Sequence, residues 1–531
     1  MKENLLTILI LIPVFGAIAL LGHHWFWKRE SHLKWIALIF VSVEFLISLF
    51  LLGEAKASAS GFYFEKNVSW IEAINANYHV GIDGLSLWLV LLTTFIMPIT
   101  VVSTWHSVEK RHAEFYVFLL LLESAMIGTF VSLDLLLFYL FFEASLVPMF
   151  FLIGVWGSDN RIYSAVKFFI YTALGSLLML AAILALYFIH ADATGIRTFD
   201  YVTILNSMRL GNLVLTVQTA ALLFWAFAIA FSIKVPLFPV HTWLPDAHTD
   251  APTAGSVILA AILLKMGTYG LMRFNFMLFP EASREYAYVF IILALIGITY
   301  GALVAMVQPD MKRLVAYSSV AHMGFVVLGM FSFTEQGMQG ALYQMLNHGV
   351  STGALFLLVG FIYERRHTRL ISEFGGLANV MPIYATVFVI TAMSSIGLPA
   401  LNGFVGEFLI MLGMWKSVAV AHPWITTMIA GTGVIFAAVY LLWMIQRVFF
   451  GKVTSPENEK LLDLSWREIG LIAPLVFLMF FMGLYPSPFL NRSKETIVAI
   501  QERVIGGEKG GMITELINTD KETQIPRTES R

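Results

Sequence analysis

The fold is decided by a short stretch in the middle of the chain, Phe231-Ser-Ile-Lys-Val-Pro-Leu-Phe-Pro-Val240, which ends a long apolar run with a lysine and two prolines. Because proline has no backbone N–H, Pro236 and Pro239 each free a carbonyl group one turn earlier in the helix. A second apolar run is broken in a similar way at Ser394-Ser-Ile-Gly-Leu-Pro-Ala-Leu-Asn-Gly-Phe404. At membrane depth such freed groups must face protein or water, so broken helices of this kind indicate a transport path.

The composition places these runs in a membrane. Of the 531 residues, 58% are hydrophobic and only 13% are charged, about half the charged fraction of a soluble protein. Apolar runs recur from Leu5 to Leu484 with no hydrophilic domain between them. A bilayer crossing needs about 20 apolar residues. We therefore predict an all-α polytopic membrane protein of about 14 transmembrane helices, centred near residues 13, 43, 94, 123, 144, 178, 226, 264, 297, 322, 350, 400, 437 and 477.

Charge and cysteine content exclude several functions. Lysine and arginine are about twice as frequent in the loops after odd-numbered spans, which places those loops on the cytoplasmic side and both termini opposite. The net charge of -2 does not favour nucleic acid as a partner. The chain has no cysteine, which excludes disulfides, zinc–thiolate sites and iron–sulfur clusters. No phosphate loop or dinucleotide fingerprint is present in a usable context. We therefore expect no cofactor in this chain.

Three charged residues lie inside predicted spans: Glu143, Lys234 and Lys265. A charge at this depth costs about 2.5–3.5 kcal/mol, so each is expected to face the protein interior. One interpretation is a structural ion pair that fixes helix packing; the one we favour is an ion pathway, which such residues commonly mark. A buried lysine gives up its proton readily unless a carboxylate is near. We therefore hypothesise that Glu143 and Lys234 act together as a protonation switch.

Later spans carry polar residues at helical spacing. His348 lies in a helix whose one face also carries Gln344, Asn347, Ser351 and Thr352, and His322 lies in the preceding span with Ser318 and Ser319. The hydroxyl and amide groups are expected to hydrogen-bond between helices. Histidine titrates near neutrality and can pass a proton between its ring nitrogens, so a relay role is favoured for His322 and His348. Glu407, beyond the second break, is a candidate exit carboxylate.

A metal site is the weaker interpretation of the segment after the first break. It contains His241, Asp246, His248 and Asp250, but the prolines on either side favour turns and helix capping. No bound metal is expected.

The chain resembles a known family over nearly its whole length. The most specific stretch is residues 234–273, which begins Lys-Val-Pro-Leu-Phe-Pro-Val-His-Thr-Trp-Leu-Pro-Asp-Ala-His-Thr-Asp-Ala-Pro; supporting stretches are residues 79–86, 310–324 and 397–407. These closely resemble the antiporter-like M subunits (chain 4) of proton-pumping NADH:quinone oxidoreductase, respiratory complex I. The stretch at 310–324 is shared by the wider antiporter family.

The resemblance implies two inverted five-helix repeats and proton translocation driven by quinone reduction elsewhere in the complex. It implies that Glu143 and Lys234 match the key glutamate–lysine pair, Lys265 and His348 the connecting residues, and Glu407 the terminal residue. Partners would be other membrane-arm subunits, including L-type and N-type antiporter-like neighbours, in a bacterial inner membrane. The expected organisation is helices 1–3 with a non-cytoplasmic loop (1–110), a first repeat (111–275), a second repeat (286–451), a last helix (466–490) and a polar, mobile tail (491–531).

Rival interpretations remain at this point. A D-type subunit of a multisubunit sodium/proton antiporter would share the fold but exchange cations without redox drive. Membrane subunits of hydrogenases or photosynthetic complexes are related alternatives. A scaffold that only bridges neighbouring pumps is a further alternative, but scaffolding gives no reason for charges at mid-membrane.

Overall fold

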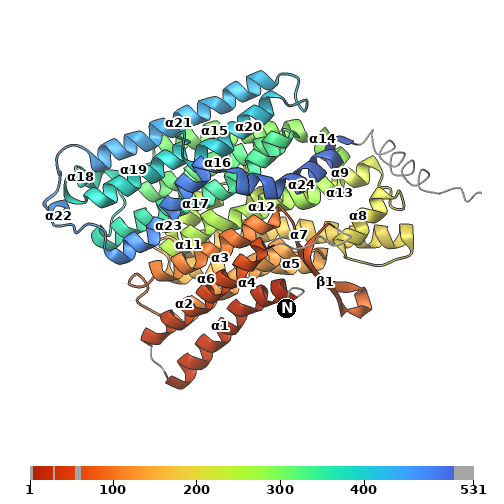
Figure 1. The fold of residues 1–531 in the computed structure, drawn as a ribbon, viewed down its shortest axis with the longest axis horizontal. Coiled ribbons are helices and arrows are strands. Elements are labelled where there is room, and N and C mark those ends of the chain that lie inside the picture. The colour runs from red at the N-terminus through yellow and green to blue at the C-terminus, as the bar shows by residue number, and fades with distance from the viewer. Residues whose placement is uncertain (1–3, 28–29, 54–60, 507–531) are drawn as a thin grey trace, which may run out of the picture.

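The chain folds as a bundle of long helices, seen side by side in Figure 1 of the computed structural model. The structure describes residues 4–27, 30–53 and 61–506. Lys28, Arg29 and Lys56, which are among the loop residues that predict the orientation, lie outside the described residues. One end of the bundle carries the strand β1 with α8 and α14, and the opposite end carries α18 and α22 (Figure 1). These two ends correspond to the two membrane faces.

The elements fall into three consecutive groups. The N-terminal group consists of α1 (Leu5–Trp27), α2 (Glu30–Ser48), η2 (Leu49–Leu52), β1 (Tyr63–Ile71), η3 (Glu72–Ile74), β2 (Ala76–Ile82) and α3 (Ser86–Ser103). The middle group consists of α4 (His112–Val131), α5 (Leu135–Ala144), α6 (Leu146–Trp156), α7 (Arg161–Thr194), α8 (Tyr201–Arg209), α9 (Val217–Lys234), α10 (Trp243–Asp250), α11 (Thr253–Ile258), η4 (Leu259–Leu263), α12 (Leu264–Gly270), η5 (Leu271–Asn275), α13 (Phe276–Leu278) and α14 (Pro280–Glu285). The last group consists of α15 (Ala287–Met306), α16 (Met311–Met330), α17 (Glu335–Arg366), η6 (Ile371–Glu373), α18 (Leu377–Val380), α19 (Pro382–Ile396), α20 (Asn402–Trp415), α21 (Pro423–Phe449), α22 (Pro456–Glu459), α23 (Trp466–Leu484) and α24 (Ser487–Ile505).

The predicted all-α membrane fold is confirmed. Within the described residues, 13 helices are long and apolar enough to span a membrane. The remaining predicted span, centred near residue 400, is divided between the shorter helices α19 and α20. The two spans Thr253–Leu278 and Glu335–Arg366 have fully buried apolar windows, although both carry polar residues. Polar side chains within a bilayer are tolerated where protein surrounds them, so these two central helices define the polar interior.

Several spans are irregular next to charged residues. The helix α9 ends at Lys234, and the chain turns before α10 begins. The second break follows α19, where Gly397 adopts a left-handed φ of +86°. A third break, which the sequence did not predict, separates α5 from α6 at Ser145, because the ring of Pro148 clashes with the carbonyl four residues earlier. It lies two residues after Glu143.

One face of the bundle is held by a hairpin and a final helix. Strands β1 and β2 pair in antiparallel fashion, in the loop where the sequence predicted only a non-cytoplasmic connection. The expected mobile tail is wrong for its first part, because residues 491–505 belong to the helix α24. In this helix Gln501 and Arg503 donate to the carbonyls of Phe333 and Met277 at 3.2 Å each. Residues 507–531 of the expected tail lie outside the described residues.

Candidate functional site

The centre of the site is a contact between Lys265 of α12 and His348 of α17. Lys265 is fully buried, and its Nζ lies 2.7 Å from Nδ1 of His348. The same Nζ donates to the carbonyl of Ala260 in the π-helical turn η4. Nδ1 of His348 lies 3.1 Å from that carbonyl. The carbonyl can therefore accept from whichever of the two side chains carries the proton.

His348 is followed by His322 and Glu407. The rings of His348 and His322 have centroids 5.8 Å apart, and Nε2 of His348 has no hydrogen-bond partner within the described chain. Nδ1 of His322 lies 3.4 Å from Oε1 of Glu407, and Nε2 lies 3.1 Å from the hydroxyl of Ser395. Gln344 also donates to Oε1 of Glu407, at 3.2 Å. Four of the predicted residues thus form one series, Lys265, His348, His322 and Glu407.

Several neighbouring polar residues hold the second break against α17, as the sequence predicted for the amides and hydroxyls. The prediction is wrong for Ser318 and Ser319, which donate to the carbonyl of Val315 in their own helix, and the hydroxyl of Thr352 has no partner among the described residues. Asn347 donates to the carbonyl of Asn402 at 2.8 Å. Ser351 contacts Ser394 at 2.7 Å, and Ser394 in turn donates to the side-chain oxygen of Asn402. These contacts join α17, α19 and α20 around the break. They fix the position of Glu407, which lies five residues after Asn402, the first residue of α20.

Glu143 and Lys234 are near each other but do not form a contact pair. Lys234 is 1% exposed, and its Nζ and one carboxylate oxygen of Glu143 have no hydrogen-bond partner among the described residues. The charge of Glu143 nevertheless acts on Lys234. The Nζ instead faces the rings of Phe142 and Phe168, at 5.1 and 5.7 Å from their centroids. An aromatic cradle favours a cation without fixing its proton.

The helix with Lys265 packs directly on the break that follows Lys234. A Cβ on Gly267 would lie 2.6 Å from the carbonyl oxygen of Phe231, so only glycine permits this approach. A Cβ on Gly270 would enter the ring of Phe231 itself. The two lysines therefore belong to helices in backbone contact.

The proposed metal-binding residues do not converge. Asp246 pairs with Lys167 at 2.7 Å and with Arg313 at 3.3 Å, while Asp250 accepts hydrogen bonds from hydroxyl groups. His241 stacks on Phe238. No group of three or more potential ligands that could hold a metal ion occurs in the described ranges. The sequence predicted turns and helix capping here; the residues just before Trp243 form turns, and Trp243–Asp250 is a helix.

His248 is a residue whose role the sequence did not predict. It is fully buried, stacks on Phe356 with centroids 4.5 Å apart, and has no partner for either ring nitrogen among the described residues. Lys265 and Lys312 are the charged groups that act on it. A cavity of about 120 Å³, lined by Asp250, Lys312 and Arg369 among others, lies at the end of the same helix, α10. In the sequence, His248 is a candidate only under the weaker interpretation of a metal site.

A second titratable cluster lies outside the spans, under the hairpin. His79 of β2 contacts Asp200 through Nδ1 and Glu65 through Nε2, the latter at 2.7 Å. Burial alone would lower the pKa of His79, but the hydrogen bond and charge of Asp200, followed by those of Glu65, raise it above its ordinary value. Burial raises the pKa of Asp200, but His79 outweighs this and lowers it. Burial raises the pKa of Asp134 to about 6.

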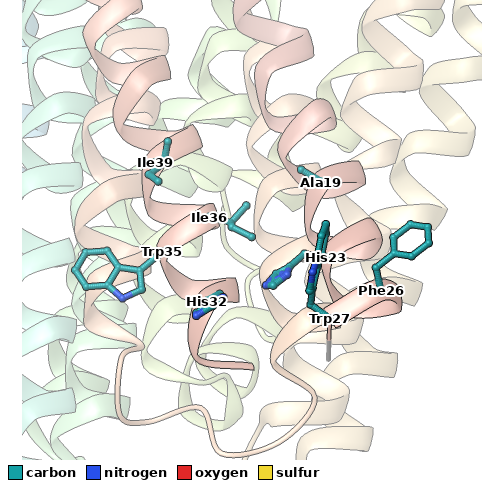
Figure 2. A pocket seen from close by; sticks show the side chains of 8 residues that line it. All are labelled: Ala19, His23, Phe26, Trp27, His32, Trp35, Ile36 and Ile39. Atoms are coloured by element: carbon teal, nitrogen blue, oxygen red, sulfur yellow. The ribbon is translucent and has the colours of Figure 1, made fainter. Parts of the chain in front are cut away.

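An open hollow lies away from these groups. It is a groove of about 950 Å³ between the ends of α1 and α2, lined by aromatic and apolar side chains and by His23 and His32. Figure 2 shows these side chains at the tips of the two helices. The two histidine rings stack with centroids 5.3 Å apart. None of the predicted site residues lines it.

A model of the family described as NADH:quinone oxidoreductase/Mrp antiporter, transmembrane, matches residues 132–449. The chain belongs to this family. It is 46% identical to NADH-quinone oxidoreductase subunit M of Rhodobacter capsulatus over 489 residues, covering 91% of this chain and 94% of the relative. It is 42% identical to subunit M of Pseudomonas aeruginosa over 508 residues, covering 93% and 97%.

Solved structures of the family share this fold. A chain of respiratory complex I from Thermus thermophilus with bound NADH matches with a TM-score of 0.83 and 31% identity, covering 94% of this chain and 99% of that chain. A chain of the Mrp complex from Dietzia matches with a TM-score of 0.78 and 21% identity, covering 99% and 57%, which shows the fold alone. The relatives named above favour the respiratory subunit over the antiporter alternative.

Proposed function

We propose that the chain is a proton-translocating membrane subunit of an NADH:quinone oxidoreductase, and that Glu143, Lys234, Lys265, His322, His348 and Glu407 transfer the protons. The observation that carries this proposal is the buried series from Lys265 to Glu407, in which neighbouring groups are 2.7 and 3.4 Å apart at its ends and 5.8 Å apart between the histidine rings. Each member can bind and release a proton.

The chemistry follows from the geometry of each group. A proton on Lys265 can pass to Nδ1 of His348, because the Ala260 carbonyl stabilises either carrier. His348 can then release a proton from Nε2 towards His322, and His322 can pass it to Glu407. At the other end, Lys234 holds its proton while the charge of Glu143 acts on it, and releases it when Glu143 is withdrawn or neutralised.

The two halves that contain these groups are proposed to be the inverted repeats, residues 111–275 and 286–451. Two aspartates in corresponding places support this. Asp134 caps α5 and forms an isolated β-bridge with Asp200, and Asp310 caps α16 and forms one with Leu370. The first bridge lies at the hairpin end of the bundle. Lys312, beside the second, lines the cavity near Arg369.

The driving reaction and the partners follow from the relatives. Proteins named NADH-quinone oxidoreductase subunit M cover most of this chain. We therefore propose that quinone reduction in other subunits supplies the energy, that this chain holds no cofactor, and that L-type and N-type neighbours flank it in a bacterial inner membrane. The sodium/proton antiporter remains the second candidate, favoured only by the shared family model.

The test is proton uptake by inverted membrane vesicles respiring on NADH, with assembly of the complex verified. Lys234→Ala is expected to abolish the part of the uptake that this chain carries while the complex assembles normally. Lys416→Ala is the matched control, because Lys416 is exposed at the end of α20. Unchanged proton uptake in Lys234→Ala would show that Lys234 has only a structural role. Uptake that needs sodium but not quinone would favour the antiporter.

A further inference from the structure

A pair of buried carboxyl groups lies in the N-terminal helices, apart from the series of site residues. Glu44 of α2 and Glu123 of α4 are both 0% exposed. All four carboxyl oxygens lack a conventional hydrogen-bond partner among the described residues. The helices α2 and α4 pack directly against each other, and the two carboxyl groups interact. The proposed mechanism uses neither residue.

The two groups lie at the same depth in the membrane. Glu44 is eight residues before the end of the span Glu30–Leu52, and Glu123 is eight residues before the end of His112–Val131. At 1.5 Å per residue, each lies roughly 12 Å inside its helix end. Both ends face the hairpin side, because Leu52 accepts a hydrogen bond from Arg492 of α24 and Ser132, which follows Val131, bridges to β2. The carboxyls therefore meet well inside the apolar layer.

Among the described residues, no cation is placed to neutralise them. The elements packed on α2 and α4 are α1, α3, η2, α5, α6, α12 and the strand β2. Their titratable groups are His23 and His24 at the far end of α1, Tyr139 and Glu143 in α5, Lys265 and Tyr269 in α12, and Tyr78 and His79 in β2. Lys265 is committed to His348 and Ala260, and His79 to Asp200 and Glu65. The other titratable groups of α2 and α4 lie at least seven residues before the two glutamates: Glu30, His32, Lys34, His112, Glu114 and Tyr116.

A metal ion does not fit the site. The hydroxyl of Ser48, one turn after Glu44, bonds to the hydroxyl of Thr94 on α3 at 2.7 Å. Ser48 also donates to the carbonyl of Phe45. No group that could hold a metal ion is found in the ranges that the structure covers, and a hard cation needs about six oxygen ligands.

We propose that Glu44 and Glu123 form a proton-binding site that carries at least one proton at neutral pH, separate from the Lys–His series. Two adjacent ionised carboxylates in a dry, apolar environment without a cation would repel each other and lose their hydration together. A proton held between them removes one charge and supplies the missing hydrogen bond between α2 and α4. The site is independent of the proposed function, because it is read in the resting complex without turnover.

The test is infrared spectroscopy of the purified complex in H₂O and D₂O. Wild type is expected to show a carbonyl stretch of a protonated carboxylic acid that shifts in D₂O. The double variant Glu44→Gln/Glu123→Gln is expected to lose that component, while its neutral amides keep the contact between the helices. Either single variant is expected to retain a band at a shifted position, because the remaining carboxyl is still buried without a cation.

Glu114→Gln on the same helix is the matched control. Glu114 is exposed and paired with Arg111, so this change should leave the acid band unaltered. The proposal is overturned if single and double variants superimpose on wild type in the acid region and differ only in the carboxylate stretch. Because the single variants also separate these outcomes, a double variant that fails to assemble does not remove the test.

Discussion

Lys234→Met separates a proton carrier from a structural ion pair through opposite effects on stability. Methionine has the length of lysine without its charge. The Nζ of Lys234 has no hydrogen-bond partner among the described residues and faces two phenylalanine rings, at 5.1 and 5.7 Å. A structural lysine would be held by a carboxylate. A carrier must be able to lose its proton, so it is bound more weakly.

The magnitude follows from these contacts. A charge at the centre of a span costs about 2.5–3.5 kcal/mol, and each ring face returns about 0.5–1 kcal/mol. Removing the charge is therefore expected to stabilise the chain by about 0.5–2.5 kcal/mol. Glu143 is only half-buried, so losing its long-range partner does not strand a fully buried charge.

The assay heats the purified complex and measures how much of this chain stays soluble at each temperature. Lys234→Met is expected to raise the midpoint while vesicle proton uptake falls. Lys416→Met, at an exposed position, should change neither. The reasoning is refuted if Lys234→Met lowers stability by about 3–5 kcal/mol, the cost of breaking a buried ion pair.

Three further outcomes are expected. Because the folded-state pKa of His79 is raised, its contribution to stability is present below the ordinary histidine range and is lost as pH rises through the raised value. Protection of the hairpin amides from hydrogen exchange should therefore fall as the pH rises through that value. His79→Gln should remove this pH dependence. Gly267→Ala places a Cβ 2.6 Å from the Phe231 carbonyl, so proton uptake by vesicles should fall several-fold. Quinone reduction is measured alongside proton uptake. Gly397→Ala meets both a φ of +86° and the carboxylate of Glu407 at 2.8 Å, and should cost about 1–3 kcal/mol of thermal stability.

The sequence predicted the membrane fold and the helices that carry the site because the costs involved are large. A charge in an apolar run and a proline inside a helix are both expensive, so both are visible without a structure. The same signal is present at Glu44 and Glu123, two carboxyl groups inside apolar runs. Distances between helices cannot be predicted in this way, because no local sequence pattern specifies which helix faces pack together.

Local geometry was less predictable for physical reasons. The π-helical turn Leu259–Leu263 has the plain apolar sequence Leu-Ala-Ala-Ile-Leu, which is equally compatible with an α-helix. The helix Ser487–Ile505 is too polar to resemble a span, and its order comes from docking across the ends of other helices. The prolines near His248 dominate the local pattern and predict a turn, whereas the structure places His248 in the helix α10.

The site is built from two separate parts, and this separation is itself informative. Lys265, His348, His322 and Glu407 approach one another closely, whereas no direct hydrogen bond joins Lys234 to Glu143 or to Lys265. A continuous series of hydrogen-bonded carriers across a membrane would conduct protons down their gradient. A pump therefore needs at least one step that opens only when energy is supplied. Under the proposed function, we place that step at Lys234, which has no hydrogen-bond partner among the described residues and lies at the end of a broken helix. Gly267 brings the helix of Lys265 into contact with this helix end.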